Sequence, residues 1–499
     1  MLGEKELLKL QNGSDVRGIA VEGVAGEEVN LTSEAVNRIA SGFVKFLSDK
    51  AGKSPDELKI TIGHDSRISA EQIKTAALRA LVANDVSVLD CGLASTPAMF
   101  MSTVFEETAA DGAIMLTASH LPYNRNGMKF FTRSGGLEKS DITAVLRNAA
   151  QVSELGADIS AVKRFALIDL YSAHLRKKIC DTLKAERPFE GMKIIVDAGN
   201  GGGGFFATKV LAPLGADITG SQFLEPDGMF PNHIPNPEDA KAMAAIKKAV
   251  LDNKADLGLI FDTDVDRMSA VLSSGEEINR NALIAMMSAI LAPDYPGSTI
   301  ITDSITSDGL KKFLEDELHL RHHRFKRGYK NVINECIRLN AAGEVSPLAI
   351  ETSGHGALSE NYYLDDGAYL AVKLLIAAAK AHKDGKNLAS LIEKLEYPVE
   401  AAEYRLKFTV DDFKAYGQKV LAEFKARAVS QGLELAEPNY EGVRINFEYG
   451  WALLRVSLHD PNMPLNVESS SVGGFEKILA TIKNLLKGFE SLDMSALAK

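Results

Sequence analysis

The chain has 499 residues, and its 45% hydrophobic content is enough to give three or four domains a core each. Its 67 acidic and 56 basic residues are spread along the sequence and give a net charge of -11, which argues against a nucleic-acid partner. The three cysteines stand singly, and we see neither a secretory leader nor an apolar run of the roughly 18 residues that a membrane helix needs, so we expect a reduced, cytoplasmic protein without a membrane partner.

Strand and helix patterns alternate in the first part of the chain. Strands are predicted over 58–63, 86–90 (with Gly92 beyond it) and 112–116, with a helix over 70–84 between the first two. Such alternation indicates βαβ units and a largely parallel sheet. Arg17 lies in a turn-rich stretch that reads by itself as a surface turn, and the motif over 63–67 reads as a capped helix start.

The sequence Leu-Thr-Ala-Ser-His-Leu-Pro over 116–122 follows the apolar run that ends the last of these strands. Ser119 would therefore lie just past the carboxyl end of a strand, where open α/β sheets bind their ligands. His120 is its neighbour and Lys129 follows ten residues on. A hydroxyl in this position could carry a phosphoryl group if charges elsewhere in the chain neutralise it.

A glycine run over 199–204 follows a predicted strand over 193–197. It fits the G-x-G-x-x-G pattern of dinucleotide-binding folds, and Glu225 lies about 20 residues further on. Successive glycines satisfy many patterns, however, and no Gly-Lys-Ser/Thr follows, so this is not a P-loop. Nucleotide binding stays open as one interpretation of this segment.

Three aspartates at alternate positions, Asp262, Asp264 and Asp266, follow an apolar strand over 255–261. Their carboxylates would converge on one side of an extended backbone, an arrangement that is costly unless a cation lies there. An EF-hand is excluded, because it needs glycine and glutamate where this chain has Arg267 and Ser273. Oxygen ligands with open positions suit Mg²⁺, and the alternative is a solvated acidic turn.

Two later segments bring polar groups to the ends of apolar stretches. The basic cluster over 325–330 includes Lys326, and the stretch after 350 groups Glu351, Ser353 and His355, which suit sugar hydroxyls. The aspartates at 365–366 read as N-caps of an apolar helix over 368–379.

The pattern changes near residue 398 to that of a smaller α+β domain. Within it, a strand predicted over 451–458 would place Arg455, Ser457 and His459 on one face of its end. An arginine fork with hydroxyl and imidazole donors could clamp a phosphate, and the alternative is an ordinary strand.

Four of these motifs stand in a fixed order along the chain: the Ser119 loop, the three aspartates at 262–266, the stretch with Glu351 and Ser353, and the stretch with Arg455 and Ser457. In that order they resemble the motifs of the α-D-phosphohexomutase family, phosphomannomutase/phosphoglucomutase type, across nearly the whole chain. The resemblance implies an α/β fold of four domains around a central cleft, three with similar mixed sheets and a smaller α+β domain at the C-terminus. We expect the domains at 1–165, 166–297, 298–396 and 397–499, carrying the phosphoserine, metal, sugar and phosphate loops respectively.

The resemblance also assigns roles to individual residues. It makes Ser119 the phosphoserine and the three aspartates, together with the phosphoserine, the ligands of Mg²⁺. Sugar hydroxyls would be bound by Glu351 and Ser353, and the substrate's phosphate by Arg455 and Ser457. Proton transfer would be assisted by Arg17, Lys129 and His355. We further expect His120 to take part in catalysis and Arg267, Lys326 and His459 to contact the substrate.

The expected reaction interconverts hexose 1-phosphate and hexose 6-phosphate, of mannose or glucose, with hexose 1,6-bisphosphate as intermediate and activator. The expected partner is this small-molecule sugar phosphate, bound by a monomer or homodimer. Phosphoglucosamine mutase is the nearest alternative. A metal-dependent phosphatase with a serine nucleophile and a nucleotide-dependent oxidoreductase are more remote ones.

The chain departs from the family's usual motifs at five positions: Leu121, Ile350, Thr352, Leu458 and His459. These departures bear on specificity rather than on the reaction. Because imidazole loses its charge near neutral pH, we expect phosphate affinity to weaken between about pH 6 and pH 8 if His459 binds phosphate.

Overall fold

The computed structural model describes residues 2–457 and 460–498. The chain divides into two compact units, one of Met1–Asn279 with Ser353–Ser390 and one of Arg280–Thr352 with Leu391–Lys499. This division is coarser than the four expected domains, whose boundaries stay a prediction.

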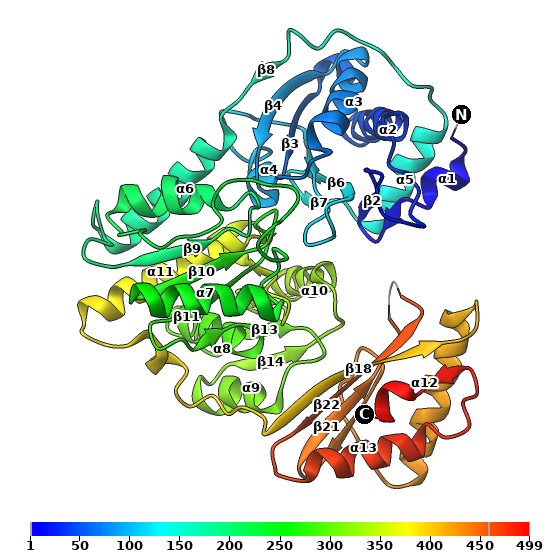
Figure 1. The fold of residues 1–499 in the computed structure, drawn as a ribbon, viewed down its shortest axis with the longest axis vertical. Helices are drawn as coiled ribbons and strands as arrows, with labels where there is room; N and C mark the ends of the chain where they lie inside the picture. The colour runs from blue at the N-terminus through cyan, green and yellow to red at the C-terminus, as the bar shows by residue number, and fades with distance from the viewer. Residues whose placement is uncertain (1, 458–459, 499) are drawn as a thin grey trace. The chain divides into compact units, whose positions relative to one another are not determined.

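The first unit contains an eight-stranded mixed sheet (Figure 1). Its strand order is β1-β2-β6-β5-β3-β4-β8, with β7 paired to β6. The strand β3 pairs in parallel with β4 and β5, whereas β6 runs antiparallel to β2 and β5. The bounds are β1 (Gln11–Asn12), β2 (Asp15–Ile19), β3 (Lys59–His64), β4 (Ser87–Leu93), β5 (Gly112–Leu116), β6 (Arg125–Thr132), β7 (Gly135–Gly136) and β8 (Lys163–Arg164).

Helices α2 (Ser33–Ala51), α3 (Ala70–Ala83) and α5 (Lys139–Ala150) pack together beside this sheet, with α1 (Glu4–Leu8) against α5. The side chain of Thr32 caps the start of α2, and Gly52 ends it in the left-handed conformation. Phe43 of α2 and Phe130 of β6 meet with ring centroids 4.7 Å apart in the core. A further helix, α4 (Thr96–Met101), packs against β5, β6 and α6 (Leu167–Leu183).

A second sheet of the first unit has the order β12-β11-β10-β9. Its strands are β9 (Ile194–Asp197), β10 (Leu257–Phe261), β11 (Met268–Leu272) and β12 (Glu277–Ile278), and α7 (Ala240–Asn253) packs on it. Because Phe261 pairs with Met268, the three aspartates lie in the tight connection between β10 and β11. The unit is completed by β16 (Gly356–Leu358), β17 (Leu364–Asp365) and α11 (Gly367–Lys383).

The second unit begins with three parallel strands: β13 (Thr299–Thr302), β14 (Arg321–Arg324) and β15 (Leu348–Ile350). Helices α8 (Arg280–Leu291), α9 (Asp308–Lys312) and α10 (Tyr329–Ala341) accompany them. The helix α10 begins within the basic cluster over 325–330 and packs on β13 and β15.

The C-terminal part of the second unit is a six-stranded antiparallel sheet in the order β19-β20-β21-β22-β18-β23 (Figure 1). Its strands are β18 (Glu400–Phe408), β19 (Glu434–Leu435), β20 (Val443–Phe447), β21 (Gly450–Leu454), β22 (Asn462–Ser469) and β23 (Leu492–Asp493), with helices α12 (Phe413–Ser430) and α13 (Gly474–Leu485). The expected fold class, mixed α/β sheets in several domains with a smaller α+β part at the end, is confirmed.

Two local expectations need correction. The strand predicted over 451–458 ends at Leu454, so Arg455 and Ser457 follow it, although their backbone N–H groups still bond to the facing chain at Pro464 and Asn462. Of the two aspartates expected to cap the helix, only Asp366 does so. Within the described ranges, no helix has the length and apolar character to cross a membrane.

Candidate active site

Ser119 lies on the loop that follows β5, as the sequence predicts. Its backbone has φ +50°, a left-handed conformation that is uncommon for serine and is held by surrounding contacts. Its N–H donates to Thr117 Oγ1 at 2.9 Å, and its Oγ donates to Asp262 Oδ2, also at 2.9 Å. The fold therefore brings the serine hydroxyl against the first of the three aspartates.

The buried guanidinium of Arg67 binds the backbone of the serine loop. It donates hydrogen bonds to the carbonyl oxygens of Ser119, Leu121 (2.7 Å), Pro122 (2.7 Å) and Arg125 (2.9 Å). Asp65 pairs with Arg67 at 3.3 Å and accepts a hydrogen bond from Thr117 Oγ1 at 2.7 Å. Sequence reasoning missed this role, because the motif over 63–67 read only as a helix start.

The three aspartates are fully or almost fully buried, and their ligand oxygens lie within 4.8 Å of one another. Thr96 at the start of α4 fixes Asp264 by two hydrogen bonds, from its N–H to the backbone oxygen (2.8 Å) and from its hydroxyl to Oδ2 (2.5 Å). The glycine run supports the same loop: a Cβ on Gly201 would lie 2.7 Å from the Cα of Thr263. Close approach to the aspartate loop thus explains a glycine that the sequence left open to a nucleotide.

Two buried cations neutralise part of this negative charge. Lys129 Nζ lies 3.0 Å from Asp264 Oδ2 and 2.5 Å from Asp266 Oδ2. Arg267 donates through Nη2 to Ser119 Oγ and to Asp262 Oδ2, both at 2.9 Å. The expected substrate contact of Arg267 stays a prediction, and its observed partners are the serine and the first aspartate.

The titration of the cluster reflects burial and crowded charge. Burial and the adjacent Asp266 raise the pKa of Asp262 well above its ordinary value. Burial also opposes ionisation of Asp266, but Lys129, His355 and Arg267 outweigh it and hold its pKa well below the usual range. Asp264 and Asp266 keep the pKa of Lys129 well above its ordinary value despite burial, so the lysine is charged.

The donor set fits a small divalent cation. The Oδ1 atoms of Asp264 and Asp266 are buried and have no hydrogen-bond partner among the described residues. Three carboxylates outnumber the two cations beside them, and carboxylate oxygens are the ligands that Mg²⁺ takes in proteins. Asp262, Asp264 and Asp266 are therefore the residues that could hold the ion.

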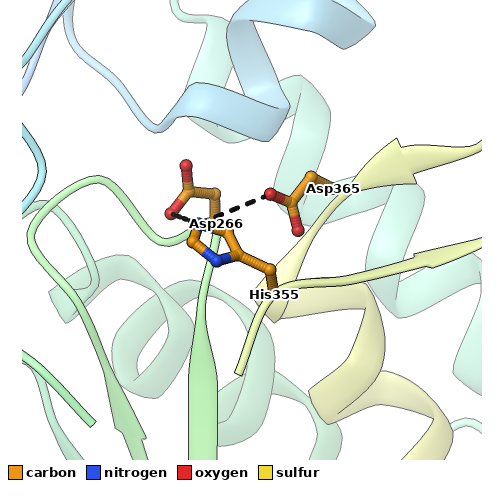
Figure 2. Close-up of side chains that lie close together, drawn as sticks. All are labelled: Asp266, His355 and Asp365. Atoms are coloured by element: carbon orange, nitrogen blue, oxygen red, sulfur yellow. Dashed lines mark ion pairs between the residues drawn. The ribbon is translucent and has the colours of Figure 1, made fainter. Parts of the chain in front are cut away.

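Two histidines border the cluster. His120 Nδ1 accepts a hydrogen bond from Arg267 Nη2 at 2.8 Å, and burial together with Arg267 lowers the pKa of His120 to about 3. Figure 2 shows His355 between two carboxylates, its Nε2 3.8 Å from Asp266 Oδ1 and 3.6 Å from Asp365 Oδ2. Burial lowers the pKa of His355 to about 3 as well. Both imidazoles are neutral in this arrangement.

Two further predicted residues belong to the same unit. Arg17 lies on β2 opposite Gly127 of β6, two positions from Lys129 on the same face of the sheet, and it pairs with Asp15 at 3.0 Å. The Ser353 hydroxyl is hydrogen-bonded to His355 Nδ1 at 2.9 Å. The first unit thus gathers the serine, the aspartates and the expected proton-transfer residues.

The remaining predicted residues belong to the second unit. Glu351 Oε1 accepts a hydrogen bond from the N–H of Gly328 at 2.6 Å, and Arg455 is buried with its Nη1 3.9 Å from Glu441 Oε1. Ser457 Oγ accepts from the N–H of Asp460 at 3.1 Å. Lys326 lines a cavity of about 460 Å³. His459, and Leu458 before it, lie outside the described residues.

Three family models match consecutive parts of the chain. They are phosphoglucomutase/phosphomannomutase α/β/α domain I over residues 9–155, domain II over 169–275 and domain III over 279–397. With the fold and the site, these matches define an isomerase of the phosphohexomutase class. The chain belongs to the phosphoglucomutase/phosphomannomutase family, as its motifs indicate.

Proteins with similar sequences are named as phosphomannomutases or phosphoglucomutases. The chain is 27% identical over 479 residues to a phosphomannomutase/phosphoglucomutase of Pseudomonas aeruginosa, covering 95% of this chain and 96% of that protein. It is 26% identical to a phosphoglucomutase of Neisseria meningitidis, with 95% of this chain and 96% of that protein covered. A solved structure of a phosphoglucomutase/phosphomannomutase family protein from Burkholderia thailandensis has the same fold, with a TM-score of 0.79, 24% identity and 98% coverage of both chains.

Proposed function

We propose that this enzyme interconverts the 1-phosphate and 6-phosphate of a hexose, mannose or glucose, through a phosphorylated Ser119. The observation that carries the proposal is the 2.9 Å hydrogen bond from Ser119 Oγ to Asp262 Oδ2, within a buried group of three aspartates. Family membership and the names of the relatives support the substrate class.

In the proposed reaction, the bond between phosphorus and Ser119 Oγ breaks as a free hydroxyl of the hexose phosphate forms a new bond to phosphorus. The hydroxyl loses its proton to a base, Ser119 Oγ takes up a proton from an acid as it leaves phosphorus, and the result is a hexose bisphosphate and unmodified serine. The bisphosphate then turns round, and its other phosphoryl group returns to Ser119. A small amount of hexose 1,6-bisphosphate would therefore activate enzyme that has lost its phosphoryl group.

In this proposal, different residues of the first unit position Ser119, bind the metal ion and transfer protons. Arg267 holds Ser119 Oγ in place, and Arg67 holds the loop. Mg²⁺, held by Asp262, Asp264 and Asp266, would supply charge neutralisation at the phosphoryl group. We assign proton transfer to His355, Lys129 and Arg17, and a further part in catalysis to His120. A neutral His355 is suited to accept a proton, whereas the charged Lys129 is suited to donate one.

We assign Glu351 of the second unit and Ser353, two residues further along the chain, to sugar hydroxyls. Arg455 and Ser457, together with His459, are assigned to the phosphate that does not react, and Lys326 to the anionic substrate. Carboxylate and hydroxyl groups suit sugar recognition, and a buried arginine fork suits a phosphate.

Phosphorus NMR time courses with mannose, glucose and glucosamine 1-phosphates test the proposal. We expect conversion to the 6-phosphate, dependent on catalytic hexose bisphosphate, with almost no inorganic phosphate released. Stoichiometric release of phosphate would instead identify a phosphatase. Fastest turnover of the glucosamine substrate would identify a phosphoglucosamine mutase.

A further inference from the structure

Glu441 is a carboxylate in the second unit to which the sequence motifs assign no role. It lies in the turn before β20, and its side chain is 13% exposed. Its Oε2 accepts a hydrogen bond from Ser304 Oγ at 2.5 Å and another from the backbone N–H of Arg327 at 3.1 Å. Both donors come from the parallel-strand part of the unit, whereas Glu441 comes from the C-terminal sheet.

The local sequence forces this carboxylate toward Arg455. Val443 pairs with Leu454, so Gly442 lies opposite Arg455 at the end of the ladder. Gly442 has φ +62°, and a Cβ there would lie 2.2 Å from the carbonyl oxygen of Leu454. Only glycine permits this approach, which carries Glu441 Oε1 to 3.9 Å from Arg455 Nη1.

Aromatic contacts fix the same turn. The ring of Tyr440 lies 4.9 Å from that of Phe325 and 5.2 Å from that of His323, measured between centroids. Asn439 closes the turn with a hydrogen bond to the carbonyl oxygen of Gly442 at 3.0 Å. The carboxylate of Glu441 is therefore held by its own turn and by two donors, independently of Arg455.

Glu441 is also the strongest anionic influence on Arg455. Burial lowers the pKa of Arg455, and Glu441 is the neighbouring charge that opposes this most. The Nε of Arg455 has no hydrogen-bond partner among the described residues. Among the described residues, this guanidinium forms its ion pair with Glu441, whose Oε1 lies 3.9 Å from Nη1.

Two adjacent backbone amides connect this carboxylate to the sugar loop. The N–H of Arg327 is bound by Glu441, and the next N–H, that of Gly328, is bound by Glu351 at 2.6 Å. Glu441 and Lys326 also line the same cavity of about 460 Å³. The peptide segment of Arg327 and Gly328 therefore holds the carboxylates of Glu441 and Glu351 at fixed positions relative to each other.

We propose that Glu441 is a positioning residue that orients the Arg455 guanidinium for the substrate's unreacting phosphate. In the same proposal, Glu441 keeps that guanidinium at a fixed position relative to Glu351. This inference rests on the proposed function, because it takes Arg455 as the phosphate clamp. It adds to that function a residue through which phosphate recognition and sugar recognition are mechanically connected.

The test is steady-state kinetics of Glu441→Gln, Glu441→Asp and Ser304→Ala, with Glu448→Gln as the matched control. Glu448 is an exposed glutamate in the turn between β20 and β21. We expect Glu441→Gln to raise KM for glucose 1-phosphate about tenfold with kcat changed less than about twofold, because it weakens binding that is equal in the ground and transition states. Glu441→Asp, which keeps the charge, should recover most of the affinity, and Ser304→Ala should raise KM by a smaller factor. Glu448→Gln should have no effect.

An unchanged KM in Glu441→Gln, or equal losses in Glu441→Gln and Glu441→Asp, would overturn the inference. Phosphoserine occupancy by intact mass and the wild-type NMR time course are measured in parallel. If the wild type forms phosphoserine and turns over, a negative result with Glu441→Gln counts against Glu441 alone. A wild type that does neither would overturn the proposed function instead. Should Glu441→Gln fold poorly, Ser304→Ala, which leaves all charges in place, decides the question by its KM.

Discussion

Lys129 lies with its Nζ 3.0 Å from Asp264 Oδ2, and both side chains are buried. The lysine neutralises carboxylates that are also suited to a divalent cation, so the same pair serves the stability of the site and its charge balance. Removing either partner leaves an uncompensated buried charge, which is costly in a protein interior. We therefore expect activity to depend on this balance and on the loop that brings Ser119 to it.

Replacing Ser119 with alanine should abolish the phosphorylated form of the enzyme. We expect turnover to fall at least about a thousandfold, because no other group would carry the phosphoryl group. Intact mass of the wild type should show a fraction with one added phosphoryl group, absent in the variant. Ser134→Ala, at an exposed serine beyond β6, is the control and should keep both. Full turnover of Ser119→Ala would exclude the serine as nucleophile.

Asp264→Asn keeps the shape of the side chain and removes its charge. We expect activity to lose its dependence on Mg²⁺ and to fall at least about a hundredfold, because an uncharged amide would be a poor metal ligand beside a charged Lys129. Titration of activity with Mg²⁺ after chelation measures both effects. Asp252→Asn, at an exposed aspartate paired with Lys248 on α7, should behave as the wild type. A variant with an unaltered Mg²⁺ titration would contradict the assignment of this aspartate.

Arg67→Lys keeps the charge beside Asp65 but cannot reproduce the fork that binds the serine-loop carbonyl groups. We expect the free energy of unfolding of this part of the chain to fall by about 2–4 kcal/mol. We also expect kcat to fall with little change in KM, because Ser119 would lose its register with Asp262. Denaturant unfolding and steady-state kinetics measure the two effects. A destabilised variant with normal kcat would show that Arg67 supports the fold and not the position of Ser119.

Asp366 should make stability depend on pH. Tyr171 Oη donates to both carboxylate oxygens of Asp366, at 2.7 and 2.8 Å. Burial raises the pKa of Asp366 from 3.8 to about 6. Since the folded state then binds the proton more tightly than the unfolded state, stability falls as pH rises from 3.8 toward about 6. The free energy of unfolding should fall by roughly 2–3 kcal/mol over this pH range because of Asp366, since one pKa unit corresponds to about 1.4 kcal/mol.

Asp366→Asn is the matching variant, because asparagine is also a good N-cap and can accept from Tyr171. The difference in unfolding free energy between the wild type and the variant, followed from pH 4 to pH 7 at about half-unit steps, isolates the aspartate from other titrating groups. A difference that does not change with pH would rule out the raised pKa.

Much of the site could be predicted from the sequence because its signals are local. An apolar run followed by Thr-Ala-Ser-His placed Ser119 at the end of β5, and alternate aspartates after another apolar run placed Asp262 and Asp266 at the end of β10. Period and turn chemistry decide such features within a few residues. Four motifs in a fixed order then sufficed to recognise the family.

Other features depend on contacts between distant residues, which no local pattern encodes. Arg67 reaches the serine loop across more than 50 positions, and Thr96 reaches Asp264 across 168. Gly201 looked like part of a nucleotide motif until its approach to Thr263 gave it another reason. The sequence motifs assigned Glu441 no role, because its donors, Ser304 and Arg327, lie more than 100 residues earlier.

The sequence by itself thus determined the fold class, the family and which loops are expected to carry the chemistry, because hydrophobic periodicity and short motifs are properties of neighbouring residues. Only the tertiary structure decided which charges meet. Burial removes water as the competing partner, so the pairing of Lys129 with Asp264 and Asp266 follows from where the folded sheets bring them.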